Sequence, residues 1–461
     1  MMRPLDILRL ATATLLSTIS FGLQPDDIIT RDVCILGGGA TGTYAAVQLT
    51  ERGHTIVIVE PKNRLGGHSD TAYLPDGNHL DFGIRAYFDQ RIVKDFFTQL
   101  DVEYELFRQP TIRTDYINLQ TGERVPSDNN ILGMILATIR YRKVIEPFDY
   151  LIPGAYELPD EVPEALLRPF REFVEEHGLQ AALPLIYTFT DALGDILEAP
   201  LLYVLQLFGS SHIDALLEGP YIRPKNGSLT LFRQAAQYIN EHRNILYQNT
   251  VTQATRSSTG VKLVVTSANG DRKLIRARKL LITFPPTFSS LCGFDLDENE
   301  LLLFSKWRYI NYYAAVLTNT GIPDGLNIFN TNPNNQPGGL PIAPYQCIID
   351  YSGYSGYYRT RIMGGMGFSE KDARQLVQDD FRRMDAAGTF PINKEPEIVA
   401  FESHSPSTIM VPVEDIRNGF YKKLYALQGL RSTYYTGYTF CTDYSAQLWN
   451  YTLSVINTMG L

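Results

Sequence analysis

Two short apolar runs near the start of the chain are separated by a glycine-rich segment and a stretch with helical character. Residues 33–36 and 55–59 are mainly apolar, which predicts buried parallel strands. Between them, residues 37–42 read Gly-Gly-Gly-Ala-Thr-Gly, and the pattern predicts a helix over 43–52 that stops at Gly53. This order of strand, glycine loop, helix and strand predicts an α/β fold of the Rossmann type.

The glycine segment satisfies the pattern G-x-G-x-x-G at Gly37, Gly39 and Gly42. Gly37 permits the tight turn, Gly39 lets a pyrophosphate approach the backbone, and Gly42 allows the helix to pack closely on the strand. The helix N-terminus offers unpaired N–H groups to phosphates, and Glu60 can accept hydrogen bonds from ribose hydroxyls. We therefore predict a dinucleotide site that includes Gly37, Gly39, Ala40, Thr41, Gly42 and Glu60.

A second glycine motif follows Glu60 and distinguishes between dinucleotides. Residues 64–68 read Arg-Leu-Gly-Gly-His. Paired glycines give backbone N–H groups room to face a second section of a long cofactor, and Arg64 supplies a cation near the pyrophosphate. An NAD enzyme has no need for this element, so the sequence favours FAD. The residues that we add to the site are Arg64, Leu65, Gly66, Gly67 and His68.

These motifs resemble the flavin-containing amine oxidase superfamily, whose members bind FAD through GxGxxG, then Glu, then RxGG. Residues 80–85 resemble the segment that passes beside the flavin ring, which places Ile84 there. Residues 246–286 resemble a three-stranded meander, with Val251 expected against the adenine. Residues 432–437 resemble the last strand, which ends with Gly437 at the flavin-side pyrophosphate.

The resemblance implies a Rossmann-type FAD-binding domain interleaved with a mixed α+β substrate domain. We assign residues 30–95, 220–290 and 405–461 to the FAD-binding domain and residues 96–219 and 291–404 to the substrate domain. We expect residues 96–219 to be mostly helical, with one helix that opens at Pro163 and stops at Gly178.

Residues 29–47 and 64–71 resemble most closely the fungal β-cyclopiazonate dehydrogenase (oxidocyclase) family. This implies a FAD-dependent oxidoreductase that removes a hydride from a small, largely apolar secondary metabolite and closes a ring. The layout is also similar to that of a bacterial polyunsaturated fatty acid double-bond isomerase, which uses FAD without net oxidation. Amine oxidation is the third alternative.

Departures from the amine oxidase pattern argue against that third alternative. The acid that usually follows the last glycine is absent, because Tyr438 follows Gly437. No lysine lies in the candidate strand 311–316, and no cysteine matches a covalent flavin link, so we expect FAD to be bound non-covalently. Two residues are candidates for catalysis. Arg85 would steady a reduced flavin or hold a substrate oxygen, unless it forms a structural ion pair, and Tyr438 would hydrogen-bond near the ring.

Tyrosines cluster in the second substrate segment, and two explanations of them stay open. They could wall a pocket for a flat or hydrophobic substrate, or they could be ordinary strand packing. The residues are Tyr345, Tyr351, Tyr354, Tyr357 and Tyr358.

Composition restricts the partners. The chain has 461 residues, and 41 basic against 50 acidic side chains give a net charge of −9, which argues against nucleic acid. The four cysteines are too few and too scattered for a disulfide framework. The cysteines and histidines form no metal-binding motif, so we predict no metal site. We expect a small-molecule substrate and O2 as the electron acceptor, and the oligomeric state stays open.

The N-terminus resembles a secretory signal. Residues 1–24 combine arginines with a semi-apolar run, which favours a signal peptide over a terminal helix and the secretory pathway over the cytoplasm. No later run is long and apolar enough for a membrane anchor. Secretion would make two sequons relevant, and we prefer Asn450 to Asn226 as the glycosylation site because Asn226 falls near the expected cofactor.

Overall fold

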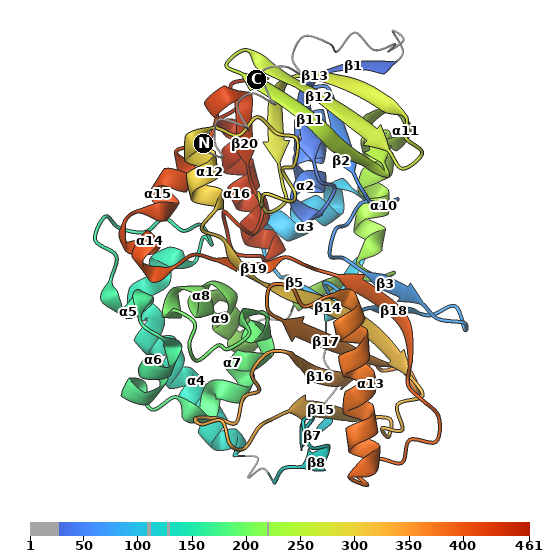
Figure 1. The fold of residues 1–461 in the computed structure, drawn as a ribbon, viewed down its shortest axis with the longest axis vertical. Coiled ribbons are helices and arrows are strands. Elements are labelled where there is room, and N and C mark those ends of the chain that lie inside the picture. Colours follow the sequence, from blue (N-terminus) through green and yellow to red (C-terminus); the bar gives the residue numbers. More distant parts are fainter. Residues whose placement is uncertain (1–26, 108–111, 127–129, 219–220) are drawn as a thin grey trace, which may run out of the picture.

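Two β-sheets form the frame of the molecule, one above the other in Figure 1. The computed structural model describes residues 27–107, 112–126, 130–218 and 221–461. The expected signal peptide at 1–24 lies outside these described residues. Across the described part of the chain, no helix combines the length and apolar character needed to cross a bilayer.

The first sheet collects strands from three distant parts of the sequence. Its order is β10-β2-β1-β13-β12-β11, and β20 also pairs with β13. The pairings of β10, β2, β1, β13 and β20 are parallel, whereas β11, β12 and β13 form an antiparallel meander. The strands are β1 (Ile28–Leu36), β2 (Ile56–Glu60), β10 (Ile245–Tyr247), β11 (Asn249–Ser257), β12 (Gly260–Ser267), β13 (Arg272–Ile282) and β20 (Thr433–Tyr435).

Helices bury one face of this sheet because its strands are apolar on both sides. Val33, Ile35 and Ile58 share a core with Tyr44 of α2 and Trp449 of α16. The covering helices are α2 (Ala40–Glu51), α3 (Arg91–Gln99), α10 (Leu229–Tyr238) and α16 (Ser445–Asn457), with the shorter α11 (Glu241–Asn244) and α12 (Glu298–Phe304) nearby. Helix α2 starts three residues before the predicted residue 43, because the glycine turn ends at Gly39.

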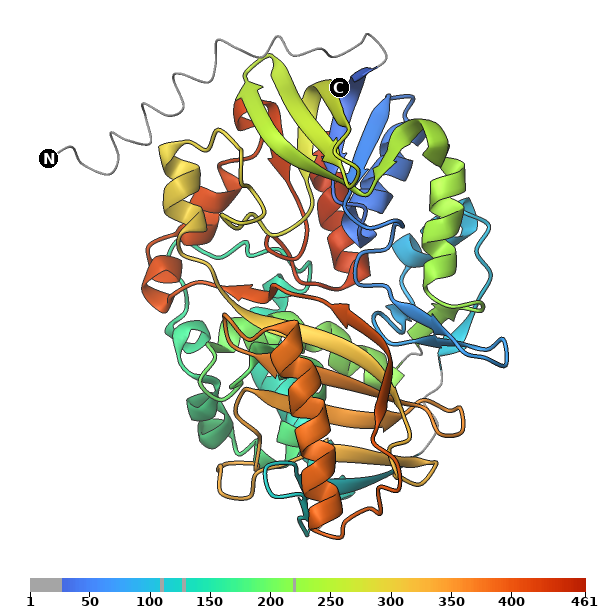
Figure 2. The ribbon, with the colours of Figure 1, turned by 45° about the vertical axis from the view of Figure 1, so that its right-hand side comes forward.

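The second sheet has the order β18-β14-β17-β16-β15-β7-β8, and β19 also pairs with β14. Helix α13 (Glu370–Ala386) crosses one face (Figure 2) and begins with a capping box formed by Ser369 and Asp372. The strands are β7 (Arg113–Asn118), β8 (Glu123–Arg124), β14 (Arg308–Thr318), β15 (Leu326–Asn330), β16 (Tyr345–Tyr351), β17 (Tyr358–Gly364), β18 (Glu397–Ser403) and β19 (Ser407–Met410).

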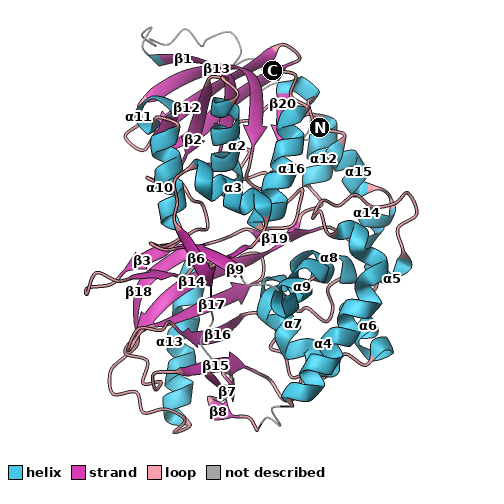
Figure 3. Ribbon diagram, turned by 180° about the vertical axis from the view of Figure 1, so that it is seen from behind, coloured by secondary structure: helices cyan, strands magenta, loops and turns pink. Residues whose placement is uncertain are grey.

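A group of helices packs beside the second sheet, opposite α13 (Figure 3). It comprises α4 (Ile131–Ile145), η2 (Glu146–Leu151), α5 (Glu164–Leu167), α6 (Phe170–His177), η3 (Gln180–Ala182), α7 (Leu183–Thr190), η4 (Asp191–Leu193), α8 (Leu201–Leu207) and α9 (Ser210–Glu218). The remaining short elements are β3 (Thr71–Tyr73), β4 (His79–Asp81), β5 (Tyr87–Phe88), β6 (Tyr104–Phe107), β9 (Tyr221–Pro224), α14 (Val413–Arg417), α15 (Phe420–Tyr425) and η5 (Leu430–Ser432).

The predicted fold class, a Rossmann-type domain interleaved with a mixed α+β domain, is confirmed, but three details differ. The helix expected from Pro163 to Gly178 breaks at Arg168, whose backbone is extended before Pro169. The segment expected to be mostly helical contains β6, β7 and β8, because β7 extends the second sheet beside β15. Strand β19 pairs with β14, so the chain leaves the second sheet only after Met410.

A buried ion-pair network ties the meander to β20. Arg256 of β11 donates two hydrogen bonds to the carboxylate of Glu300 in α12, at 2.6 and 2.7 Å, and the Tyr435 hydroxyl of β20 donates another at 2.5 Å. The side chain of Arg256 is fully buried and that of Glu300 is 5% exposed. A bidentate pair in this setting stabilises the fold only while both partners remain.

Removing the charge of Glu300 should therefore destabilise the protein strongly. We expect Glu300→Gln to lower the free energy of unfolding by about 2 kcal/mol, because the buried Arg256 would lose its bidentate carboxylate and keep only the more exposed Asp295, at 2.8 Å, as a counter-charge. Urea denaturation followed by circular dichroism measures this change. The control is Glu172→Gln, which removes an exposed pair with Arg168 and should leave the free energy of unfolding near the wild-type value. Equal losses in both variants would contradict the network's role.

Candidate cofactor and active site

The first glycine motif forms a turn that only glycine can make. Gly37 has φ +98°, and a Cβ on Gly42 would lie 1.9 Å from the carbonyl oxygen of Gly37. Gly39 is the N-cap of α2, where no side chain caps the helix and no acidic residue occupies the first turn. The N–H groups around Ala40 and Thr41 are therefore placed to bind an anion such as a diphosphate.

The second glycine motif lies directly against the first. A Cβ on Gly67 would lie 2.9 Å from the Cα of Gly39, and the Gly66 N–H donates to the Gly38 carbonyl at 2.8 Å. Gly66 and Gly67 both have positive φ, and Leu65 is buried beneath them. The two motifs thus form one continuous backbone wall, and this fits an extended dinucleotide.

Glu60 is held beside this wall. Its carboxylate accepts hydrogen bonds from the Gly38 N–H at 2.6 Å and the Lys62 N–H at 2.7 Å. Burial raises the pKa of Glu60, although these hydrogen bonds and the charges of Lys62 and Arg64 oppose the shift. Each carboxylate oxygen retains a lone pair, so ribose hydroxyls could still donate to it.

A buried cluster that sequence reasoning missed joins the second motif to the other domain. Asp70, whose side chain is 1% exposed, accepts hydrogen bonds from Arg64 and from His404 Nε2, the latter at 2.7 Å. Burial opposes ionisation of Asp70, but His404, Lys62 and Arg64 outweigh it, so the Asp70 pKa lies below its usual value. The His68 ring stacks on His404 with centroids 4.3 Å apart.

The proton state of His68 follows from this arrangement. Burial and the charge of His404 lower the pKa of His68 well below its ordinary value, so its imidazole is neutral at pH 7. No spacing in the sequence signals the pairing of Asp70 with His404, because the two residues belong to different domains and meet only through folding.

The segment expected beside a flavin ring also lies at His68. The Ile84 N–H donates to the His68 carbonyl at 3.2 Å, and a Cβ on Gly83 would lie 2.0 Å from that oxygen. The buried Ser228 hydroxyl donates to the Ile84 carbonyl at 2.7 Å. This serine is the third residue of the sequon at Asn226. Asn226 itself is exposed, as is Asn450 on α16.

The last predicted contacts come from the middle and the end of the chain. A Cβ on Gly437, where φ is +104°, would lie 2.8 Å from the Thr283 carbonyl oxygen. The Thr283 hydroxyl donates to the carbonyls of Leu36, at 2.9 Å, and Gly37, at 3.2 Å. Gly437 is thus adjacent to the first glycine turn. Val251 is half-buried at a bulge in β11.

The two catalytic candidates have different surroundings. Arg85 forms an ion pair with Asp350 at 3.1 Å. This is the structural ion pair that the sequence analysis gave as the alternative to a catalytic role. Burial lowers the pKa of Arg85 to about 10. The Tyr438 hydroxyl donates to the Pro406 carbonyl, and its ring centroid lies 6.1 Å from that of His68. Burial raises the pKa of Tyr438.

An unpredicted carboxyl group lies six residues after Gly437. Asp443 is exposed while its neighbour Thr442 is buried, and its side chain has no hydrogen-bond or ion-pair partner among the described residues. Burial, with a contribution from the charge of Asp191, raises the pKa of Asp443 to about 6. An exposed side chain with a pKa raised by burial fits a carboxyl group that faces an enclosed space.

Side chains from both domains surround this carboxyl group. Its charge raises the pKa values of Tyr312 on β14, Tyr438 and Tyr444, and the Asp191–Arg361 ion pair, at 3.0 Å, lies nearby. The other titratable groups coupled to it are Tyr156 and Cys441, whose thiol is free.

Two of the clustered tyrosines serve strand packing. The Tyr345 hydroxyl donates to the carbonyls of Asp191 and Gly194, at 2.8 and 3.0 Å, and both Tyr345 and Tyr358 are buried. Tyr345 and Tyr358 are therefore part of the packing of the second sheet and do not line a substrate pocket that the structure describes.

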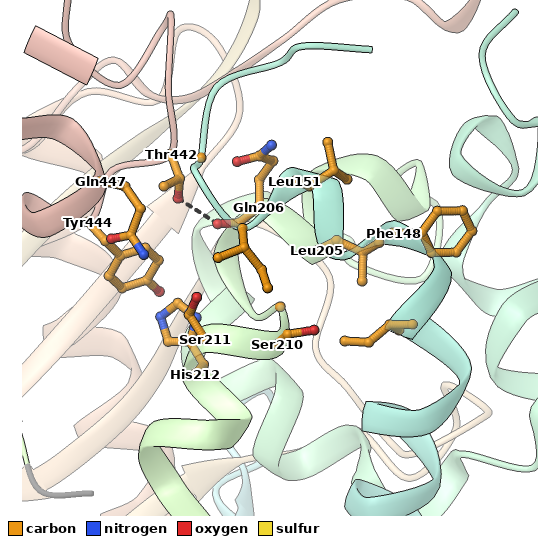
Figure 4. Close-up of a pocket in the computed structure, with 14 residues that line it drawn as sticks. Phe148, Leu151, Leu205, Gln206, Ser210, Ser211, His212, Thr442, Tyr444 and Gln447 are labelled. Atoms are coloured by element: carbon orange, nitrogen blue, oxygen red, sulfur yellow. Dashed lines mark hydrogen bonds between the residues drawn. The ribbon is translucent and has the colours of Figure 1, made fainter. Parts of the chain in front are cut away.

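A pocket opens beside the loop that carries Asp443, and we call it the Gln206 pocket (Figure 4). Its cavity volume is about 30 Å³, which is room for one or two water molecules. Ile145, Phe148, Leu151, Ile152 and Leu205 supply its apolar wall, and its polar lining includes Gln206, Ser211, His212, Thr442, Tyr444 and Gln447. None of the predicted cofactor-binding residues lines it.

Comparisons with known proteins identify relatives of the whole chain and of its fold. The NAD(P)-binding Rossmann-like domain family matches residues 35–100. The β-cyclopiazonate dehydrogenase of Aspergillus oryzae is 38% identical over 98% of this chain and 99% of its own length. A FAD-dependent oxidoreductase of Cochliobolus heterostrophus is 32% identical over 92% of this chain and 90% of its own length. The fold is similar to that of a fatty acid isomerase from P. acnes that produces CLA, with a TM-score of 0.73, 19% identity, and 95% and 100% of the two chains covered.

The Asp70 cluster should contribute stability that depends on pH. We expect Asp70→Asn to lower the free energy of unfolding by about 3 kcal/mol at pH 7, because a buried negative partner of Arg64 is lost. The Asp70 pKa is lowered in the folded protein, so its contribution is present above a pH of about 4, the ordinary carboxyl pKa, and is lost as the pH falls further. Urea titrations at several pH values measure the difference.

The control for this experiment is Asp271→Asn, which changes an exposed carboxylate in the turn between β12 and β13. Its unfolding free energy should stay near the wild-type value. If Asp70→Asn has the wild-type free energy of unfolding at pH 7, the ion pairs and hydrogen bonds of Asp70 do not stabilise the fold.

Proposed function

Since the chain belongs to the family of the β-cyclopiazonate dehydrogenases and related FAD-dependent oxidoreductases, we propose that it oxidises a small, largely apolar secondary metabolite by hydride transfer to FAD. The observation that carries this proposal is the backbone wall built by the Gly39 and Gly67 motifs beside Glu60, which suits both halves of FAD. We further propose that FAD is held non-covalently and reoxidised by O2.

FAD, when bound, supplies the hydride acceptor, and the protein supplies position and proton transfer. The N–H groups of the α2 N-terminus would hold the diphosphate, and Glu60 would hold a ribose. Neutral His68, stacked on His404, would form an uncharged surface near the ring.

We assign proton transfer to Asp443. With the hydride acceptor that FAD would supply, the substrate carbon would lose a hydride while the Asp443 carboxylate takes the proton of the adjacent N–H or O–H, which leaves a C=N or C=O bond. An internal nucleophile would then attack the carbon of that bond and close the ring. The heteroatom would take the proton back from Asp443 as the π bond opens, and the nucleophile's own proton would pass to the Asp443 carboxylate. The support is that the Asp443 carboxyl has no side-chain partner among the described residues and a pKa of about 6, both suited to a general base.

A redox-neutral double-bond isomerase is the alternative function. Its supporting observation is the fold similarity to the fatty acid isomerase, which by itself concerns the fold alone. In that reaction, the hydride would return to a different carbon of the substrate. Secretion through residues 1–24, with glycosylation at Asn450, is a separate proposal that N-terminal sequencing and glycosidase treatment of secreted protein would test.

Anaerobic titration with a family substrate tests the oxidoreductase proposal. We expect the full-length protein to carry FAD that acid precipitation releases. Addition of β-cyclopiazonate, the compound for which the relative is named, should bleach the flavin absorbance persistently, and O2 should restore it. Persistent oxidised absorbance with a rearranged product would favour the isomerase. Protein that cannot be loaded with FAD would contradict both functions.

The pH dependence of flavin reduction tests the role of Asp443. Because the base must be ionised, the reduction rate in stopped flow should rise with pH and level off above about 6. Asp443→Asn should lower the plateau about 100-fold or more and remove this dependence, and Asp443→Glu should restore part of it.

A titration without substrate supplies an independent readout. The absorbance of the bound oxidised flavin should change with an apparent pKa near 6, and this change should disappear in Asp443→Asn. The Asp271→Asn control should keep both the transition and the rate. A wild-type pH profile in Asp443→Asn would exclude Asp443 as the base.

A further inference from the structure

Helix α4 carries an apolar face that nothing in the described part of the chain covers. Its first nine residues, 131–139, are mainly apolar on all sides of the helix, and a helix of that kind is normally buried on all sides. Here one side is buried, through Ala137, Tyr141 and Ile145, in the helical group beside the second sheet (Figure 3). The residues of the opposite side are each between 44% and 67% exposed. They are Ile131, Leu132, Ile135, Leu136 and Ile139, and we call them the α4 face.

The spacing of these five residues makes the α4 face continuous. Positions i, i+1, i+4, i+5 and i+8 lie on one side of an α-helix, in two adjacent rows. Single exposed aliphatic residues are ordinary in proteins, whereas a contiguous apolar patch marks a contact surface. Covering the α4 face with an apolar partner would therefore be favourable.

Contacts on the buried side hold α4 in place, so the exposure of the α4 face does not come from loose packing. The Tyr141 hydroxyl donates to the Phe208 carbonyl at 3.0 Å. Arg142 forms ion pairs with Asp214 of α9, at 2.9 Å, and with Asp149 of η2, at 3.2 Å. The α4 face is thus presented by a helix that is anchored to its neighbours.

All charged residues of α4 lie in its last six positions, beyond the aliphatic ones. Besides Arg142, they are Arg140 and Lys143, which are exposed and have no ion pair within the described part of the chain. Glu146, the first acidic residue after the helix, is also exposed. The surface next to the α4 face therefore carries charges of both signs, as the headgroups of zwitterionic phospholipids do. A net charge of −9 over the whole chain opposes approach to a strongly anionic surface.

The composition of the α4 face argues against a protein partner. Protein interfaces are typically anchored by Trp, Tyr and Arg in fitted pockets, and a stable interface takes about 20–30 residues a side. The α4 face offers Ile and Leu side chains and no aromatic ring. The hydrocarbon chains of a lipid need no fitted shape, so aliphatic side chains alone suffice for insertion among them.

A second copy of this chain is also a poor partner. Two α4 helices related by a twofold axis would pair either antiparallel or parallel. The antiparallel arrangement would bury Arg140 and Lys143 of one copy on Ile131 and Leu132 of the other, at a desolvation cost. The parallel arrangement would place like charges beside each other. A lipid surface keeps the two cationic side chains in its headgroup layer and meets neither cost.

We propose that the α4 face inserts its aliphatic side chains into the surface of a zwitterionic phospholipid membrane, with Arg140 and Lys143 at the lipid phosphates. The binding is peripheral and reversible, since no helix in the described part of the chain is long and apolar enough to cross a bilayer. Membrane binding through α4 does not depend on the proposed oxidation.

Vesicle flotation with the FAD-loaded, full-length protein tests this membrane contact. We expect the wild type to float with phosphatidylcholine vesicles. Leu132→Gln combined with Leu136→Gln should lower its partition coefficient about tenfold or more, because two inserted side chains become polar. The N-terminal run at 1–24 is the same in every variant, so it cannot account for a difference between them.

The matched control is Leu301→Gln combined with Leu302→Gln on α12. These leucines are 44% and 60% exposed, but α12 packs beside the first sheet, away from α4 (Figure 1). The control should partition as the wild type does. Absence of wild-type binding, or equal partition of the two double variants, would overturn the proposal.

A fluorescent side chain reports insertion without removing apolar surface. Both tryptophans of the chain, Trp307 and Trp449, are buried, so Ile135→Trp adds the single exposed indole. Its emission should shift to the blue with phosphatidylcholine vesicles, and brominated lipids should quench it. Leu302→Trp is the control and should show neither change. Unshifted and unquenched emission from vesicle-bound Ile135→Trp would overturn the proposal.

Two further measurements distinguish the other partners of the α4 face. Replacing part of the phosphatidylcholine by phosphatidylglycerol should change the partition coefficient by less than about threefold, and binding that requires phosphatidylglycerol would overturn the proposal. Light scattering without lipid should give the same mass for the wild type and the Leu132→Gln/Leu136→Gln variant. A wild-type dimer that this variant dissociates would overturn the proposal, because a second copy would then cover the face. Both double variants should keep the wild-type Tm, since the exchanged side chains are exposed.

Discussion

The close approach of backbone segments at the glycine motifs is the constraint on which the rest of the structure depends. Gly42 lies against the carbonyl of Gly37, Gly67 against Gly39, and Gly437 against Thr283, and a Cβ at Gly42, Gly67 or Gly437 would come within 3 Å of its neighbour. Side chains at these points would separate α2, the second motif and the last strand. Because side chains are absent at these points, three parts of the chain meet around the N-terminus of α2.

This convergence explains why the two domains cannot be separated by cutting the chain. The first sheet needs β1, β13 and β20, which come from the beginning, the middle and the end of the sequence. The connections between them build the second sheet and its helices. Asp70 and His404 then join the second glycine motif to the other domain, so the domains share a buried cluster as well as the chain crossings.

The loop after Gly437 has a double role in this arrangement. Its glycine lies against the first sheet, and two of its later residues, Thr442 and Tyr444, line the Gln206 pocket on either side of Asp443 in the sequence. The side chains of Thr442 and Tyr444 are hydrogen-bonded to α8, so the loop holds Asp443 between fixed neighbours. A short segment therefore connects the glycine motifs to Asp443 and to the Gln206 pocket.

The sequence by itself determined the strand–glycine–helix unit, the family and the chemistry of the cofactor frame. Gly37 to Glu60 and Arg64 to His68 form their structure from consecutive residues, so local rules suffice. The break at Pro169 followed equally local rules, although the apolar pattern across it had suggested one helix. Only the tertiary structure decided the pairing of Asp70 with His404, the isolation of Asp443 and the exposure of the α4 face. The physical reason is that burial and hydrogen-bond pairing depend on which distant residues meet, and neither periodicity nor spacing along one chain records that.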